Sequence, residues 1–555
     1  MKKLLFSSLL AILLFGLLFS SRYLVDDTAK TPKSSNDFII GAHYFGDEWP
    51  VNFWSSEIYN VQKDLQNIKN DGFNSIVLVI PWGEFQPSIS PIRYNEQLFD
   101  RLKYIIEEAS KTNLKVILRL GYVWDFDPTV QYPSSERFKK LPYDQEFYNA
   151  WLEYIGEIQH QVASYNNVSF AFLTWEDLWG MVDEARTLKT VSERIHYADV
   201  TGYQRFLKEN YKLSEVSQLY GQSFASYEDI PTPTSDNPGI KWLYEYCDDL
   251  LINRYFVPAK EKFPNLSLEV RVDSDLVHTN NGNEWFSHQS TYDLPNSEYT
   301  TMYYSPAMGA ENRGNFDSAT KVIARFENIV GNVRNNSNNK IFIDQFLYYD
   351  NTPAFGHNTL IEPSQEKEFL KKSYDVLSNY TNGYALWNYR DYAANMLYNP
   401  AFEFDFKGWE TFGNLSIVKN NGDKSAEIQQ GGILKNIIPK SKDSYQAFFE
   451  NVRLSFNSRS LIDGTVVKIR LGNWQETKVI DQKWRSYTFD IPLKNLESYN
   501  LSFQVQKGSL IVDDVKIYSF VQRGKVYDEY GNGEELLSSI RELNSRLNAR
   551  ISTSP

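Results

Sequence analysis

The chain has 555 residues, a formal net charge of -13 and a sequence pI of about 5.2. This acidic balance argues against a nucleic-acid-binding protein, which needs a basic face. The single cysteine, Cys247, excludes an intrachain disulfide, and the histidine and cysteine content shows no metal-ligand spacing, so we expect no metal and no other cofactor. Aromatic residues make up 15% of the chain, which suits stacking on sugars and equally suits a large core with its rim.

The N-terminal segment 1–21 starts with Lys2 and Lys3 and continues as an apolar run. A basic start before an apolar run is typical of a signal peptide, and this run is also long enough to cross a bilayer. We therefore expect an exported protein, either secreted or anchored in the membrane by its N-terminus, in the orientation that the lysines favour. The polar segment 22–36 is expected to form a linker.

Strand-like and helix-like segments alternate from residue 37 to residue 398, which is the pattern of a parallel α/β fold. The strand-like runs lie at 38–45, 74–80, 115–121, 169–174, 268–272, 299–304, 340–346 and 383–387. An open doubly wound sheet is the alternative to a closed barrel. The eight strands, the helices between most of them and the absence of a Gly-rich dinucleotide turn favour a (β/α)8 TIM barrel.

Polar and aromatic side chains stand where several of these strands end, and the carboxyl ends of barrel strands form the face that carries the site. These candidate site residues are Trp82, Arg119, Trp175, Glu176, Tyr303, Gln345 and Trp387. Glu176 and Asp177 follow an apolar run directly, where a buried charge is costly unless it has a partner or a role. The alternative is that both acids cap the segment that follows. The other residues have structural alternatives too, as ion pairs or rim packing.

Three stretches look familiar: Trp82-Gly-Glu-Phe-Gln-Pro87, residues 94–102, and Lys115-Val-Ile-Leu-Arg119. They resemble the start of barrels in the large retaining glycosidase clan, and residues 202–231 are similar to the excursion after strand four in family forty-two β-galactosidases. The resemblance implies hydrolysis of a glycosidic bond by two carboxylates about 5–5.5 Å apart. It implies that Glu176 is the acid/base, although Trp175 stands where the clan has an Asn.

The clan nucleophile is a Glu at the end of strand seven, and here Gln345 takes that position, with Asp344 one residue earlier. An amide cannot form the glycosyl-enzyme. Three explanations stay open: a local bulge makes Asp344 the nucleophile; another carboxylate serves, such as Glu84, Asp273 or Asp275; or the barrel binds glycan without cutting it.

The supporting residues follow from the same resemblance. Arg119 would hold a carboxylate ionised, Trp387 would be the sugar platform, and Tyr303 would hydrogen-bond the nucleophile. Trp82, Trp175 and Gln345 complete the expected substrate contacts.

Residues 399–521 show short alternating runs with turns between them, which indicates a β-sandwich. Asn399-Pro-Ala-Phe-Glu403, the run 484–489 and the run 511–515 resemble jelly-roll carbohydrate-binding modules. Trp474 is a candidate stacking residue in such a module, and a packing domain without a ligand is the alternative. The tail 522–555 contains helical spacing at 534–547, which predicts a helix docked on either domain or on another subunit.

The sequence therefore predicts a glycoside hydrolase acting on an oligo- or polysaccharide, with Glu176 and Asp344 as its two carboxylates. The competing prediction is a non-catalytic protein that binds glycan or assembles a surface polysaccharide, and Gln345 favours it.

Overall fold

The computed structural model describes residues 38–57, 60–125, 127–279, 282–310, 314–420, 423–438, 450–496 and 499–553. The expected signal or anchor segment 1–21 and the linker 22–36 lie outside these ranges. Within them, no helix combines the length and the apolar character that a membrane crossing requires.

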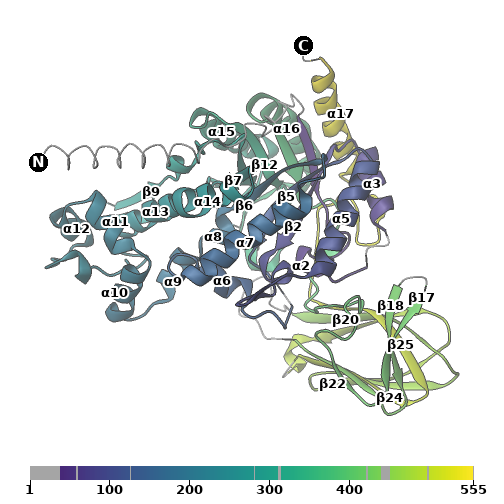
Figure 1. Cartoon of the computed structure of the whole chain (residues 1–555). Helices are drawn as coiled ribbons and strands as arrows, with labels where there is room; N and C mark the ends of the chain where they lie inside the picture. The colour runs from purple at the N-terminus through teal and green to yellow at the C-terminus, as the bar shows by residue number, and fades with distance from the viewer. Residues whose placement is uncertain are drawn as a thin grey trace, which may run out of the picture. The chain divides into compact units, whose positions relative to one another are not determined.

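Eight parallel strands close into a barrel (Figure 1), in the order β1-β14-β12-β10-β7-β6-β5-β2. Their bounds are β1 (Ile39–His43), β2 (Ser75–Pro81), β5 (Lys115–Tyr122), β6 (Val168–Thr174), β7 (Leu266–Glu269), β10 (Tyr299–Tyr304), β12 (Lys340–Phe346) and β14 (Gly383–Leu386). The first and last strands pair in register, Ile39 opposite Gly383. The predicted (β/α)8 barrel is confirmed, and the open sheet is excluded because no edge strand remains.

Amphipathic helices cover the outside of the barrel. The main ones are α3 (Val61–Asn70), α5 (Glu96–Lys111), α7 (Gln145–Val162), α14 (Val257–Lys262), α15 (Ala319–Asn335) and α16 (Glu366–Tyr380). In α5, Leu98, Leu102 and Ile105 recur every three or four residues and are buried, as expected for a helix with one face on a core. Between β6 and β7 the chain makes a longer helical excursion through α8 (Trp175–Leu178), α9 (Gly180–Thr187), α10 (Val191–Val200), α11 (Tyr203–Asn210), α12 (Leu213–Tyr220) and α13 (Ile240–Asp249).

A separate apolar cluster fills the barrel interior. It takes side chains from most of the strands: Ile39, Val77, Ile117, Phe170, Phe172, Tyr299, Phe342 and Ala385. Because strand side chains alternate between the two faces, the residues two positions further along each strand also point inward, nearer to the carboxyl ends. This alternation brings Arg119, Thr174 and Trp387 toward the face where a barrel carries its site.

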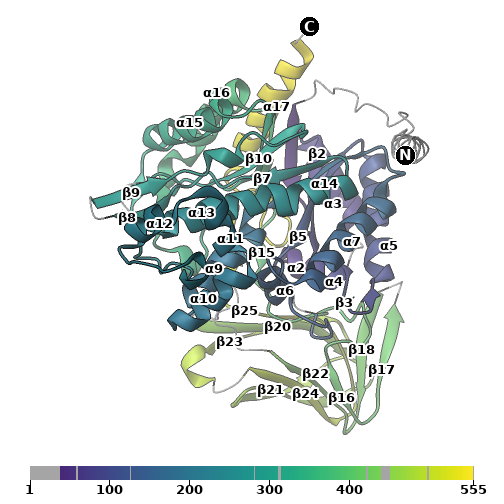
Figure 2. The same cartoon turned by 60° about the vertical axis from the view of Figure 1, so that its left-hand side comes forward.

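The second domain is a sandwich of two five-stranded antiparallel sheets (Figure 2), as predicted. One sheet has the order β16-β19-β24-β21-β22 and the other β17-β18-β25-β20-β23. The strands are β16 (Glu410–Phe412), β17 (Leu415–Asn420), β18 (Asp423–Gln429), β19 (Ile433–Ile437), β20 (Asn451–Ser460), β21 (Thr465–Leu471), β22 (Trp474–Ile480), β23 (Arg485–Pro492), β24 (Asn500–Lys507) and β25 (Ser509–Tyr518). In β20, Val452, Leu454 and Phe456 alternate with more exposed residues and enter the sandwich core.

After the sandwich the chain returns to the barrel. Strand β26 (Val521–Gln522) pairs antiparallel with β15 (Tyr392–Ala393), which follows the last barrel strand. Helix α17 (Leu537–Thr553), yellow in Figure 1, then packs against α16. Its Arg541 donates to Asp71 Oδ1 at 2.7 Å, in the turn that precedes β2. The predicted C-terminal helix is therefore present, and it docks on the barrel.

Candidate active site

A cavity of about 60 Å³ lies at the carboxyl ends of the barrel strands, and four of the predicted site residues line it. These four are Arg119, Glu176, Gln345 and Trp387. The aromatic part of the wall consists of Trp49, Tyr122, Trp124, Trp387, Tyr392 and Phe520. An aromatic wall with a few polar groups is the usual composition of a small-ligand site.

Glu176 reaches the cavity because β6 turns directly into the short helix α8. Thr174 Oγ1 accepts the backbone N–H of Asp177 at 3.2 Å, which fixes this turn. The Glu176 side chain is 47% exposed, and its Oε2 accepts a hydrogen bond from Arg119 Nη2 at 3.2 Å. Asp177 is only 2% exposed and accepts from Val123 N at 2.9 Å and Arg119 Nη2 at 3.2 Å. The two neighbouring acids thus separate into a solvent-facing carboxylate and a structural one.

Arg119 connects the polar groups of the site. Its guanidinium is 2% exposed and donates to Glu176, to Asp177 and, at 3.4 Å, to Gln345 Oε1. Burial alone would lower the pKa of Arg119, but the charges of Asp177 and Glu176 raise it well above its usual value. Burial likewise raises the pKa of Asp177, against the opposing effect of the Arg119 charge. This permanent cation therefore holds both Glu176 and the Gln345 amide in place.

A bulge occurs at the end of β12. Met302 pairs with Ile343 and the next residue, Tyr303, pairs with Gln345, so the register passes over Asp344. Asp344 is 1% exposed and does not line the cavity, whereas Gln345 does. The local shift that the sequence analysis considered is therefore present, but it turns the amide and not the carboxylate to the cavity.

Asp344 lies in the barrel interior, where it continues the inward alternation of Phe342. Its backbone carbonyl is 2.7 Å from His43 Nε2. Burial raises the pKa of its carboxyl group to about 6, and burial together with the charge of Asp344 raises the pKa of the equally buried Glu269 well above its usual value. Attack on a sugar needs an accessible carboxylate, so this position does not fit the predicted role of Asp344 as nucleophile.

The structure does not bring the other three predicted contacts to the cavity. Trp82 is fully buried, and its indole donates to Gln86 Oε1 at 2.8 Å, because the chain turns inward at α4 (Trp82–Phe85) directly after β2. Trp175 packs with Trp179 and lies 4.1 Å beneath the Arg271 guanidinium. Tyr303 donates to Asp273 at 3.0 Å. These positions correct the expected substrate contact of Trp82, and they give Trp175 and Tyr303 protein partners.

Several cavity residues were not among the predicted site residues, and three of them carry polar or strap contacts described below. Asp350 follows β12 in a loop and lines the cavity; its Oδ1 accepts from Thr352 N at 2.9 Å. The only available signal was its place four residues after the strand end. Phe520 and Gln522 come from the segment beyond the sandwich, for which the sequence offered no signal. Among the described residues that line the cavity, the carboxylates are Glu176 and Asp350.

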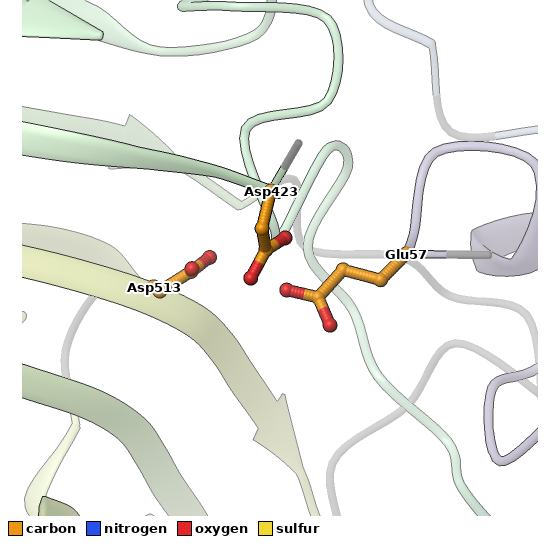
Figure 3. A group of neighbouring side chains, drawn as sticks. All are labelled: Glu57, Asp423 and Asp513. Atoms are coloured by element: carbon orange, nitrogen blue, oxygen red, sulfur yellow. The ribbon is translucent and has the colours of Figure 1, made fainter. Parts of the chain in front are cut away.

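A second acidic group lies apart from this cavity. Glu57, Asp423 and Asp513 point toward one another (Figure 3), and each offers an oxygen within 4.8 Å of the others. Burial is the main cause that raises the pKa of Glu57 to about 9 and that of Asp513 to about 8, with the other acids adding to it. Carboxylate oxygens are ligands of hard cations, so this is the group in the described part of the chain whose spacing suits a metal ion.

Part of the chain is similar to known proteins, and the matched family model ends before Glu176. Residues 34–170 match the family model Cellulase (glycosyl hydrolase family 5). The chain is similar to mannan endo-1,4-beta-mannosidase 5 of Solanum lycopersicum, with 26% identity over 218 residues, which cover 36% of this chain and 49% of that protein. The chain thus spans about half the length of the curated relatives it matches. The family model and these relatives all carry glycosidase names.

Structural comparison finds distant barrels. One is exo-beta-1,4-mannosidase Op5Man5 from Opitutaceae bacterium strain TAV5, with a TM-score of 0.36 and 14% identity over 64% of this chain and 53% of that chain. Another is a catalytic mutant of Gan42B, a GH42 beta-galactosidase from G. stearothermophilus, with a TM-score of 0.47 and 11% identity over 64% of this chain and 52% of that chain.

Proposed function

We propose that the protein hydrolyses a β-linked oligo- or polysaccharide, with Glu176 as the general acid. The observation that carries this proposal is the position of Glu176 at the end of β6, half exposed in an aromatic-walled cavity and held by the buried Arg119. A carboxyl group in this position can protonate the leaving glycosidic oxygen. The family match over residues 34–170 supports the same class of reaction.

The second carboxylate in this proposal is Asp350. Gln345 occupies the position expected for the nucleophile and cannot form a glycosyl-enzyme, while Asp350 is the other carboxylate on the cavity wall. In the reaction, protonated Glu176 gives its proton to the leaving oxygen as the bond to the anomeric carbon breaks. Water attacks that carbon and passes a proton to Asp350. A single displacement of this kind inverts the anomeric configuration.

The sugar is part of the proposal. The tomato relatives are named as β-mannosidases, and the sequence resembles family forty-two β-galactosidases, so β-mannosides, β-glucosides and β-galactosides form the first substrate panel. The sandwich is proposed to hold the same glycan. Export, by secretion or by an N-terminal anchor, also belongs to the proposal because of the signal-like pattern of residues 1–21. Fractionation of cells that express the chain with and without these residues tests the export.

A second candidate function is glycan binding without cleavage. The observation that favours it is the Gln345 amide, which Arg119 holds at the usual nucleophile position. A protein that only binds glycan would keep the aromatic wall of the cavity but would not hydrolyse the glycosidic bond.

The test is hydrolysis by the wild type and four variants, Glu176→Gln, Asp350→Asn, Asp344→Asn and Gln345→Glu. We expect Glu176→Gln and Asp350→Asn to lose about 10²- to 10⁴-fold in kcat on unactivated substrates, which is the usual contribution of a general acid or base. Asp344→Asn, whose carboxyl group is away from the cavity, is the matched control. If Asp344→Asn loses turnover and the wild type retains the anomeric configuration, Asp344 is the nucleophile. If the wild type binds glycan without hydrolysing it, and Gln345→Glu hydrolyses it, the protein is a glycan-binding protein and not an enzyme.

A further inference from the structure

The segment 520–524, which we call the strap, is a fixed wall of the cavity although it comes from beyond the sandwich. Val521 O accepts from Asn351 Nδ2 at 2.8 Å, and Arg523 N donates to Asn351 Oδ1 at 2.9 Å. Gly524 N donates to Asp391 Oδ1 at 2.7 Å. A Cβ at Gly524 would lie 2.1 Å from the carbonyl oxygen of Asn388, so the strap sits directly on the loop after β14. Backbone bonds to two barrel loops hold it there.

Alternate residues of the strap face the cavity. Phe520 and Gln522 both line it, as expected for positions two apart in an extended segment. Gln522 is 4% exposed, and both ends of its amide are occupied: Thr352 Oγ1 donates to its Oε1 at 2.8 Å, and its Nε2 donates to Asp350 Oδ1 at 3.3 Å. Gln522 therefore fixes the orientation of the carboxylate that we assign as the base.

The cavity that the strap and Glu176 both line is small. The cavity measures about 60 Å³, against about 300 Å³ or more for pockets that enclose a drug-sized ligand. Most of its wall is buried, as Trp49, Tyr122 and Tyr392 are, whereas the Glu176 side chain is 47% exposed. Glu176 is thus the exposed part of the cavity wall. Because the acid protonates the leaving group, the leaving part must point outward and the retained sugar inward.

We propose that the strap restricts the site to the end of a glycan chain, so that Phe520 contacts the terminal sugar, Gln522 holds Asp350, and the rest of the chain leaves on the side of Glu176. A chain that runs through the site needs two open ends, and in this proposal the strap closes one of them. This inference rests on the proposed hydrolysis, and it adds the substrate class: chain ends, released one sugar at a time. It also makes Gln522 a positioning residue for Asp350.

The first experiment follows the products of the full chain acting on a reducing-end-labelled hexasaccharide of the sugar it cleaves. We expect the monosaccharide and a ladder of products that shorten one unit at a time from the first time point. Products from the middle of the chain at early times would overturn the proposal while leaving the hydrolysis intact. The two proposals therefore fail in different ways.

Variants then test the residues. Gln522→Ala should lower kcat/KM by about tenfold or more, because a hydrogen bond to a charged group is lost and a tenfold rate change corresponds to about 1.4 kcal/mol. The matched control is Arg523→Ala in the same strap, whose side chain is exposed; it should stay within about twofold of the wild type. For a positioning role, Gln522→Ala must lower kcat and shift the acidic limb of the pH profile, which the base Asp350 sets, and Gln522→Glu must not restore either. Equal losses in Gln522→Ala and Arg523→Ala would refute it.

A binding measurement covers the case of no turnover. Tryptophan fluorescence is titrated with two lengths of the same polysaccharide at equal mass, using Glu176→Gln. Binding should scale with the molar concentration of chain ends, and Phe520→Ala should weaken it. Binding that scales with mass and ignores length would overturn the inference, whatever the catalytic outcome.

Discussion

Replacing Arg119 with methionine tests the electrostatic account of the site. The substitution removes the buried cation and leaves Asp177, 2% exposed, with its bonds to Thr174 and Val123 but with no opposite charge. Removing one partner of a buried ion pair costs about 3–5 kcal/mol. The second pair, with the half-exposed Glu176, adds less than about 1 kcal/mol because solvent screens it. Since whole domains are stable by about 5–15 kcal/mol, we expect Arg119→Met to remove a large part of the stability of the barrel.

The assay is urea unfolding followed by tryptophan fluorescence, with the barrel transition compared between variants. Adding Asp177→Asn to Arg119→Met should recover half or more of the loss, because the buried carboxylate that Arg119 contacts directly is then neutral. Arg453→Met in the sandwich is the matched control: it breaks an exposed pair with Asp490 and should cost less than about 1 kcal/mol. A loss under about 1 kcal/mol for Arg119→Met, or no recovery in the double variant, would refute the reasoning.

Three further predictions concern other parts of the chain. Because Asp513 has a pKa raised to about 8, the folded state keeps a proton that the unfolded chain releases near pH 4. The free energy of unfolding should therefore fall as the pH rises from about 4 to 8. In thermal unfolding, Asp513→Asn should reduce this slope by up to about 1.4 kcal/mol per pH unit. Leu543→Ala on α17 should cost about 2–5 kcal/mol in the same barrel transition, since Leu543 is buried, while exposed Glu542→Ala should cost almost nothing. Trp82→Phe should lower stability and leave KM unchanged, because Trp82 does not face the cavity; a raised KM in a stable variant would show a substrate contact.

The barrel and the location of the candidate site were predictable because both follow from local patterns. Strand runs alternate with helical spacing along residues 37–398, and the carboxyl ends of the strands necessarily share one face. Glu176, Arg119 and Trp387 each end such a run, and all three line the cavity. The periodicity of the sequence was therefore enough to predict the barrel strands and the position of these three residues.

The details that failed depend on single-residue geometry. Pattern alone cannot distinguish Asp344 from Gln345, because the bulge between Ile343 and Gln345 decides which side chain reaches the cavity. Trp82 also ends a strand, but α4 turns it into the core. Phe520 and Gln522 reach the site through contacts between segments distant in sequence. No periodic pattern in the sequence predicts such contacts.

The return of the chain to the barrel has a consequence for biosynthesis. Gln522 bonds to Thr352, 170 residues earlier, and Arg541 bonds to Asp71 across 470 residues. All eight barrel strands have left the ribosome before the sandwich is made, yet the cavity still lacks its strap and the barrel still lacks its last helix. Nascent chains therefore hold an open, incomplete site until residues 520–524 and α17 have been made. Contacts between residues so distant in sequence form slowly, so the docking of the strap and of α17 is expected to be a late step in folding.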